Sequence, residues 1–166
     1  MTKERTLDRE THKSYVLNIT AFDSGTPPLE SGNTFTLFVT VTDANDNRPE
    51  FDKDKYEFEV PEDESVGARI LTFTVRDDDE GANSQLQVSI LEPTFKKSFE
   101  IRQRAYQEYE MVLLEELNFE NRSSYSFTMK AQDAGVPQLE SSTSVRIYYR
   151  CTGFNLIGRL SSNFGI

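Results

Sequence analysis

Hydrophobic and polar residues alternate in short segments along the chain, which is the pattern of β-strands that bury one face. Every second residue is apolar in segment 15–21 and again in segment 35–41. Segment 24–33 between them is dense in Gly, Pro, Ser and Asn, the residues that favour turns. The pattern therefore predicts two strands joined as a β-hairpin.

This pattern occurs twice. When the sequence is aligned with itself at an offset of 110, residues 7–42 match residues 117–152 without a gap, and 12 of 36 positions are identical. Asp23 falls on Asp133, for example. The period is longer than that of solenoid repeats and is typical of a tandem array of domains of about 100 residues.

The second copy contains more strands than the first. Alternation predicts about seven short strands in it, at 56–60, 70–75, 86–90, 99–101, 111–113, 125–131 and 145–149. Their number and spacing are typical of a β-sandwich. The first copy begins just before segment 7–10, so only its last two strands are expected. An isolated hairpin is marginal in water, and we expect it to expose Tyr15, Leu17, Leu37 and Val39.

Charge narrows the class of partner. The formal net charge is −10 at pH 7, and residues 43–83 hold fourteen acids against five bases. This excess argues against nucleic acid or an anionic membrane surface as the main partner and favours cations. One His and one Cys leave no parts for a zinc cluster or an internal disulfide. No apolar run approaches the roughly 18 residues of a membrane span, and the charged start does not resemble a signal peptide.

Two segments concentrate oxygen-bearing side chains, Asp43-Ala-Asn-Asp-Asn47 and Asp77-Asp-Asp-Glu-Gly-Ala-Asn83. Carboxylate and amide oxygens without nearby nitrogen or sulfur donors are what calcium prefers, and it takes about six to eight of them. Neither segment is an EF-hand loop, because both lack the glycine at position six and the glutamate at position twelve. The ligands must therefore converge from separate places in the chain.

Five segments resemble the calcium motifs of cadherin extracellular repeats, in the order found in that family. They are Leu7-Asp-Arg-Glu10, Ala21-Phe-Asp-Ser-Gly-Thr-Pro27, Asp43-Ala-Asn-Asp-Asn-Arg-Pro-Glu-Phe51, Pro61-Glu-Asp63 and Asp77-Asp-Asp-Glu-Gly-Ala-Asn83. The Asp-x-Asn-Asp-Asn linker is highly specific, and the resemblance covers roughly residues 5–149. It implies an all-β fold of immunoglobulin-like Greek-key β-sandwich repeats.

The resemblance also implies a ligand set. In cadherins a short linker between successive repeats carries three calcium ions, with ligands from the repeat before, the linker and the repeat after. By position these ligands are Asp8 and Glu10, the side chains of Asn45 and Asp46, backbone oxygens of Ala44 and Asn47, and then Asp77, Asp79, Asp133 and the backbone oxygen of Asn83. The six carboxylates would balance three Ca²⁺ ions, and bound metal would make the two repeats a stiff rod.

One of the three ions is expected to be best retained. It needs only residues that are present, namely Asn45, Asn47, Asp77, Asp79, Asn83 and Asp133. The other two depend on a further glutamate from the start of the first repeat, which the chain does not include.

The resemblance divides the chain into three parts. Residues 1–49 would be the C-terminal part of one repeat ending in the calcium linker, 50–149 a second repeat, and 150–166 a tail foreign to the family. In the second copy Asn118-Phe119 replaces Asp-Arg, and the linker motif does not return at 153–157. We therefore expect no calcium cluster after the second repeat.

The function implied by the resemblance is calcium binding with calcium-dependent homophilic cell–cell adhesion, on the extracellular side of the plasma membrane. Its partners would be neighbouring cadherin repeats in cis and another cadherin in trans. A non-adhesive calcium-binding spacer is the alternative. Paired carboxylates could also perform glycosidase chemistry, but no signature of a deep cleft accompanies them, so we do not expect an enzyme.

Overall fold

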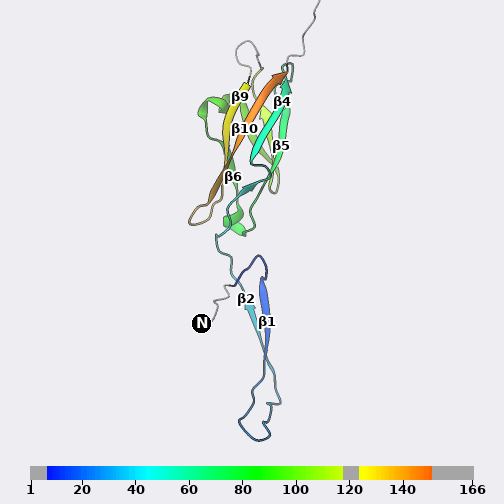
Figure 1. Cartoon of the computed structure of the whole chain (residues 1–166), viewed down its shortest axis with the longest axis vertical. Coiled ribbons are helices and arrows are strands. Elements are labelled where there is room, and N and C mark those ends of the chain that lie inside the picture. The colour runs from blue at the N-terminus through cyan, green and yellow to red at the C-terminus, as the bar shows by residue number, and fades with distance from the viewer. Residues whose placement is uncertain (1–6, 118–123, 151–166) are drawn as a thin grey trace, which may run out of the picture.

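The computed structural model describes residues 7–117 and 124–150. Figure 1 shows a β-hairpin at one end of an elongated molecule and a larger body of strands at the other. The elements are β1 (Ser14–Ile19), β2 (Phe35–Thr40), β3 (Glu50–Phe51), β4 (Lys55–Pro61), β5 (Arg69–Arg76), the 3₁₀ helix η1 (Gly81–Ser84), β6 (Gln87–Ile90), the 3₁₀ helix η2 (Pro93–Lys97), β7 (Phe99–Ala105), β8 (Glu108–Leu113), β9 (Ser124–Gln132) and β10 (Glu140–Arg150). Neither helix in these ranges is long or apolar enough to cross a membrane.

Strands β3 to β10 form the larger body, called the sandwich below. One sheet has the order β4-β10-β9-β6 and the other β3-β5-β8-β7. Strand β4 pairs with β10 in parallel, and the other pairs are antiparallel. The chain crosses from the first sheet to the second between β4 and β5, and it crosses back at β6. Neighbouring strands within a sheet are therefore often not consecutive in sequence. This arrangement confirms the predicted all-β sandwich.

The core of the sandwich holds the strands that lead into the candidate site. Side chains alternate between buried and exposed along β9 and β10, as the sequence pattern predicts. The Phe73 ring lies 5.7 Å from the Tyr56 ring of the other sheet, which joins the two sheets, and 5.7 Å from the Tyr109 ring on the neighbouring strand of its own sheet. Because β5 and β9 are anchored in this core, the residues that follow them directly, Asp77 and Asp133, are held in fixed positions.

All seven strands predicted in the second copy are present, and β7, β8 and β10 are each at least three residues longer than predicted. Strands β7 and β8 extend to a tight turn at Tyr106-Gln107, where Gln107 has a φ of 60°. Residues 102–105 of β7 are all exposed because β7 lies at the edge of its sheet, whereas the outer half of β8 alternates around the buried Tyr109. The short strand β3 and both 3₁₀ helices were not predicted, since their sequences carry no periodic pattern.

Strands β1 and β2 form the predicted hairpin, called the hairpin below. Leu17 and Leu37 are exposed, as expected, whereas the expectation was wrong for Tyr15 and Val39, which are half-buried. Among the described residues β2 pairs with β1 alone, so an apolar face that would belong to a core is left in contact with water.

The hairpin differs in register from its counterpart in the sandwich. Tyr15 pairs with Val39, whereas the equivalent Tyr125 of β9 pairs with Ile147 instead of Tyr149. The shift is two residues, which keeps the same side chains on the same face. Strand β10 is held by β4 on its other edge, while β2 has one neighbour, so its register is less strongly specified.

We expect this difference to appear in amide hydrogen exchange. Amides of β1 and β2 should exchange at least about 100-fold faster than those of β9 and β10, because few buried contacts oppose opening of the hairpin. Exchange followed by mass spectrometry compares the two equivalent hairpins within one sample. If the amides of both hairpins are equally protected from exchange, the apolar face of the β1–β2 hairpin is not exposed to water.

Candidate metal centre

Three segments meet between the hairpin and the sandwich, at a place called the junction below. Residues 7–13 precede β1, residues 43–49 form the linker, and residues 77–86 follow β5 and contain η1. The linker ends at Pro49, whose side chain is fully buried. Because each segment is attached to a strand, side chains distant in sequence are brought to one place.

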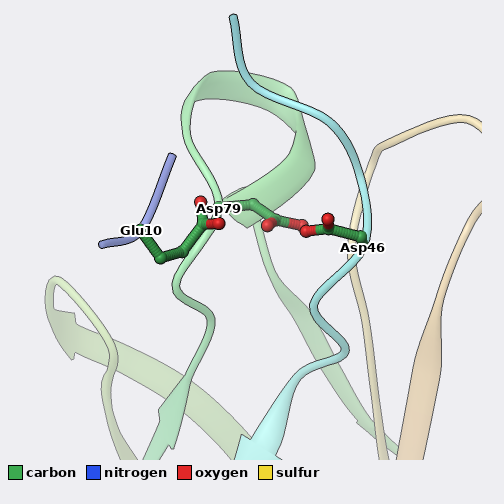
Figure 2. Close-up of side chains that lie close together, drawn as sticks. All are labelled: Glu10, Asp46 and Asp79. Carbon is green, nitrogen blue, oxygen red and sulfur yellow. The ribbon is translucent and has the colours of Figure 1, made fainter. Parts of the chain in front are cut away.

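Carboxylates from all three segments converge at the junction. Oxygen atoms of Glu10, Asp46 and Asp79 lie within 4.8 Å of one another. Figure 2 shows the three side chains pointing toward a common region from three separate stretches of chain. Asp79 is buried, while Glu10 and Asp46 are exposed. Carboxylates held this close repel one another, and a cation coordinated by them would relieve that repulsion.

Asparagine side chains attach the linker to the sandwich. Asn47 Nδ2 donates to Asp79 Oδ1 at 2.7 Å, and the Asn47 backbone N–H donates to Asp79 Oδ2 at 3.3 Å. Asn45 Nδ2 donates to Asp133 Oδ2 at 3.2 Å and to the Pro137 carbonyl at 2.5 Å. Both amides thus contact carboxylates of the predicted ligand set. The Asn47 amide can exchange its nitrogen and oxygen by a simple flip, which would turn its oxygen toward a metal beside Asp79.

Asp77 is the most strongly perturbed acid at the junction. It is 4% exposed, and its Oδ1 accepts a hydrogen bond from the Asp79 backbone N–H at 3.1 Å. Burial, together with the negative charges of Asp79, Asp133 and Asp78, raises the pKa of Asp77 to about 6, although that hydrogen bond lowers it. A nearby cation would favour the charged form of this carboxylate.

Two buried oxygens fit a hard cation. Asp77 Oδ2 and Asn45 Oδ1 have no hydrogen-bond partner in the described part of the chain. Leaving a buried polar atom unpaired costs free energy, so such atoms need an explanation. Both belong to the predicted calcium ligand set, and an oxygen-only donor set is the type that calcium takes. The residues present therefore fit calcium.

Other predicted ligands lie nearby with partners of their own. Asp133 is buried and accepts hydrogen bonds from the Gly135 and Leu139 backbone N–H groups at 2.9 and 3.1 Å. Asn83 Nδ2 donates to Asp43 Oδ2 at 2.8 Å, and the Ala44 carbonyl accepts from the Asp46 N–H at 3.0 Å.

Asp8 is not brought into the group of three carboxylates. It is exposed and accepts hydrogen bonds from the Thr11 hydroxyl at 2.7 Å and the Thr11 backbone N–H at 3.1 Å. These bonds lower the pKa of Asp8 below its ordinary value. That Asp8 is a calcium ligand stays a prediction.

Three further residues support the junction, and the sequence reasoning assigned none of them a role. Arg9 is buried, and its guanidinium forms an ion pair with Asp43 of the linker. Gln107 Nε2 donates to the Asp77 carbonyl at 2.9 Å. A Cβ at Gly135 would lie 2.5 Å from Asn45 Cγ and 2.6 Å from Asn83 Oδ1, so any larger residue there would force the Asn45 and Asn83 side chains to move. The match of Gly135 with Gly25 in the repeat was a signal, but it also fits an ordinary turn.

Comparison with known proteins decides the family. The family model described as "Cadherin domain" matches residues 56–148, more than half of the chain. The chain belongs to the cadherin family. Human protocadherin gamma-B4 is 40% identical over 129 residues, which is 78% of this chain and 13% of that protein. Protein dachsous of Drosophila melanogaster is 36% identical over 143 residues, 85% of this chain and 4% of that protein.

Solved structures of cadherin repeats share the fold. The structure titled protocadherin gammaB7 EC3-6 cis-dimer aligns with a TM-score of 0.76 at 32% identity, over 87% of this chain and 34% of that one. Mouse cadherin-23 EC22-24 aligns with a TM-score of 0.73 at 28% identity, over 88% of this chain and 45% of that one. Both alignments cover less than half of the compared chain.

Membership of the cadherin family carries general properties with it. Cadherin domains bind calcium and serve as adhesion modules, not as enzymes, so the glycosidase alternative is set aside. The predictions on Asn118-Phe119 and on residues 153–157 lie outside the described residues.

Proposed function

We propose that the cadherin chain binds calcium at the junction and that bound calcium holds the hairpin and the sandwich in one orientation. The observation that carries this proposal is the convergence of Glu10, Asp46 and Asp79 from three segments within 4.8 Å. No single segment of the chain could bring these oxygens together, so the site exists only when the linker is seated between the other two segments.

The ligand set is proposed residue by residue from the geometry and the family resemblance. Glu10, Asp46 and Asp79 would hold a cation that reaches both the hairpin and the sandwich. The predicted set Asn45, Asn47, Asp77, Asp79, Asn83 and Asp133 would hold a second on the sandwich side, and the unpaired Asp77 Oδ2 and Asn45 Oδ1 support this assignment. Bound calcium would supply the positive charge that these oxygens lack. Asp8 and the backbone oxygens of Ala44 and Asn47 complete the proposed set.

The proposed division of the chain follows from this site. Residues 1–49 belong to one cadherin repeat and its calcium linker and residues 50–149 to a second repeat, whose last strand also takes in Arg150; residues 151–166 belong to neither. The junction between the first two parts is then the functional element, because it sets the angle between repeats. A stiff junction would let weak contacts at distant tips of an array act together.

In the full-length protein we propose calcium-dependent homophilic adhesion on the extracellular side of the plasma membrane. Neighbouring repeats in cis and another cadherin in trans are the proposed partners. The cis-dimer of protocadherin gammaB7 repeats is an example of such contacts in a relative. A non-adhesive calcium-binding spacer is the second candidate, because the chain covers 13% of the length of human protocadherin gamma-B4.

Thermal unfolding tests the calcium proposal. Calcium that binds only the folded chain should stabilise it by about 1–3 kcal/mol at roughly ten to a hundred times the dissociation constant. The unfolding midpoint should therefore rise by several degrees relative to a sample in chelator. A midpoint that is the same at every calcium concentration would refute calcium binding by the folded chain.

Bead aggregation separates adhesion from spacing. Beads coated with the chain should cluster in calcium and disperse in chelator if this segment adheres to itself. Binding of calcium without clustering would instead favour the spacer. Beads coated with an Asp79→Ala variant control for clustering that does not depend on the junction.

A further inference from the structure

Arg9 is a buried cation at the junction. The residue is 5% exposed, although its neighbours Asp8 and Glu10 are exposed. Taking a guanidinium out of water costs free energy unless anions surround it. The burial of Arg9 therefore requires carboxylates on several sides, and three are present.

The guanidinium contacts one carboxylate from each segment of the junction. Arg9 Nη1 lies 2.9 Å from Glu10 Oε1 on its own segment. Arg9 Nε lies 3.1 Å from Asp43 Oδ1 of the linker, and Nη2 lies 2.6 Å from Glu80 Oε1 beyond β5. The Glu10 contact is a hydrogen bond, whereas the Asp43 and Glu80 contacts are ion pairs without hydrogen-bond geometry. The planar guanidinium presents its charge along three edges, so it can face three carboxylates at once, which the compact ammonium of lysine cannot match.

Asp43 continues the contact into the sandwich. Its second oxygen, Oδ2, accepts hydrogen bonds from the Glu80 backbone N–H at 3.1 Å and from Asn83 Nδ2 at 2.8 Å. Asp43 is thus held by Arg9 on one side and by the loop after β5 on the other. A continuous set of contacts joins the segment before β1, the linker and the sandwich through protein atoms alone.

The acids held by Arg9 are largely separate from the candidate metal ligands. Asp43 and Glu80 are not in the group formed by Glu10, Asp46 and Asp79, and neither was predicted as a ligand. Only Glu10 takes part in both, as a partner of Arg9 and as a member of the three-carboxylate group.

We propose that Arg9 is a positioning residue that ties the hairpin to the sandwich without metal, using its own charge as a permanent cation between Asp43 and Glu80. The tie goes beyond the proposed calcium function, because it needs no calcium and acts in its absence. It limits the freedom of the junction in chelator and keeps the segment that carries Glu10 close to Asp79. In the second copy Phe119 stands at the position of Arg9, so the sequence offers no equivalent cation there.

Lys13 provides a matched control. Its Nζ lies 2.7 Å from the same Glu80 oxygen that Arg9 contacts, but its side chain is 69% exposed. An exposed ion pair contributes little, whereas removing Arg9 leaves the largely buried Asp43 carboxylate, 18% exposed, without its cation. Lys13→Met and Arg9→Met each remove one positive charge beside Glu80, but only Arg9→Met removes the contact with the linker.

Spin-label distance measurements in chelator test the tie. Labels are attached through Thr40→Cys on β2 and Thr72→Cys on β5, both exposed, with Cys151→Ser removing the native thiol. The distance distribution of the otherwise unaltered chain should be at most about half as wide as that of Arg9→Met, because the variant loses the buried guanidinium that joins Asp43 to Glu80. Lys13→Met should match the unaltered chain, and Arg9→Lys should be broadened.

Three outcomes would overturn the proposal: equal widths for the unaltered chain and Arg9→Met in chelator, equal broadening by Lys13→Met, or no broadening by Arg9→Lys. Unfolding of the sandwich in chelator should change by no more than about two degrees in each variant, since Arg9 lies outside the core. Repeating the measurement in calcium reports the calcium function separately: a failure of calcium to narrow the distribution counts against that function and leaves the comparison in chelator intact.

Discussion

Replacing Asp79 with alanine should weaken calcium binding by about 100-fold or more, because calcium affinity depends on the number of charged ligands. Asp79 is buried, belongs to the three-carboxylate group and receives both hydrogen bonds from Asn47. Its loss would remove charge from the cation site and release the linker from the sandwich at the same time. Titration calorimetry of the purified chain measures the change directly.

Asp8→Ala is the comparison variant for this prediction. Asp8 is exposed and already accepts hydrogen bonds from Thr11, so its removal should weaken calcium binding less than Asp79→Ala does. Asp133→Ala should resemble Asp79→Ala, since Asn45 contacts it. Asp79→Asn keeps the shape of the side chain and guards against a folding defect. Equal losses for Asp8→Ala and Asp79→Ala would refute the ranking of these ligands.

Gly135→Ala is expected to displace the linker and weaken calcium binding by about tenfold or more, since small misplacements of a positioned group are costly. The added methyl would lie 2.5 Å from Asn45 Cγ and 2.6 Å from Asn83 Oδ1, closer than any real contact allows. Asn45 must then leave Asp133 and Pro137. Thermal unfolding measures this loss of calcium affinity: the rise in unfolding midpoint on adding calcium should be smaller in Gly135→Ala than in the unaltered chain.

The repeat supplies a control at the equivalent glycine. A Cβ at Gly25 would meet Asp23 Oδ1 at 3.0 Å and the Pro27 carbonyl at 3.3 Å, both within its own loop. Gly25→Ala should therefore change calcium affinity by about twofold at most, because it touches no part of the junction. If Gly135→Ala and Gly25→Ala reduce calcium affinity equally, the calcium site does not depend on the close approach of the linker to Gly135.

Much of the sandwich could be predicted from the sequence because buried strands impose a strict alternation. Strands such as β9 and β10 bury every second side chain, and the pattern is visible without a structure. Strand β3 has only two residues and pairs through Val75 and Arg76, so its existence depends on a neighbour distant in sequence. The register of the β1–β2 hairpin likewise depends on which strand edges are paired. A register shift of two residues leaves the alternation of apolar and polar residues unchanged, so the sequence pattern does not reveal it.

Some residues of the candidate site could be predicted from the sequence and others could not. Asp79 and Asp133 could be assigned from motif position, because each lies in the loop that follows a predicted strand, three residues after β5 for Asp79 and one residue after β9 for Asp133. The burial of Arg9 could not, since charged residues between two acids are usually solvated and its partners Asp43 and Glu80 lie far along the chain. Its role follows only once three segments are seen to meet.

A crystal structure of the chain grown in saturating calcium, with anomalous differences locating the ions, tests the central claim most directly. We expect at least one calcium ion at the junction, with oxygens of Glu10, Asp46 and Asp79 at coordination distances of about 2.3–2.6 Å. Calcium-saturated crystals with no ion among these three residues would contradict it.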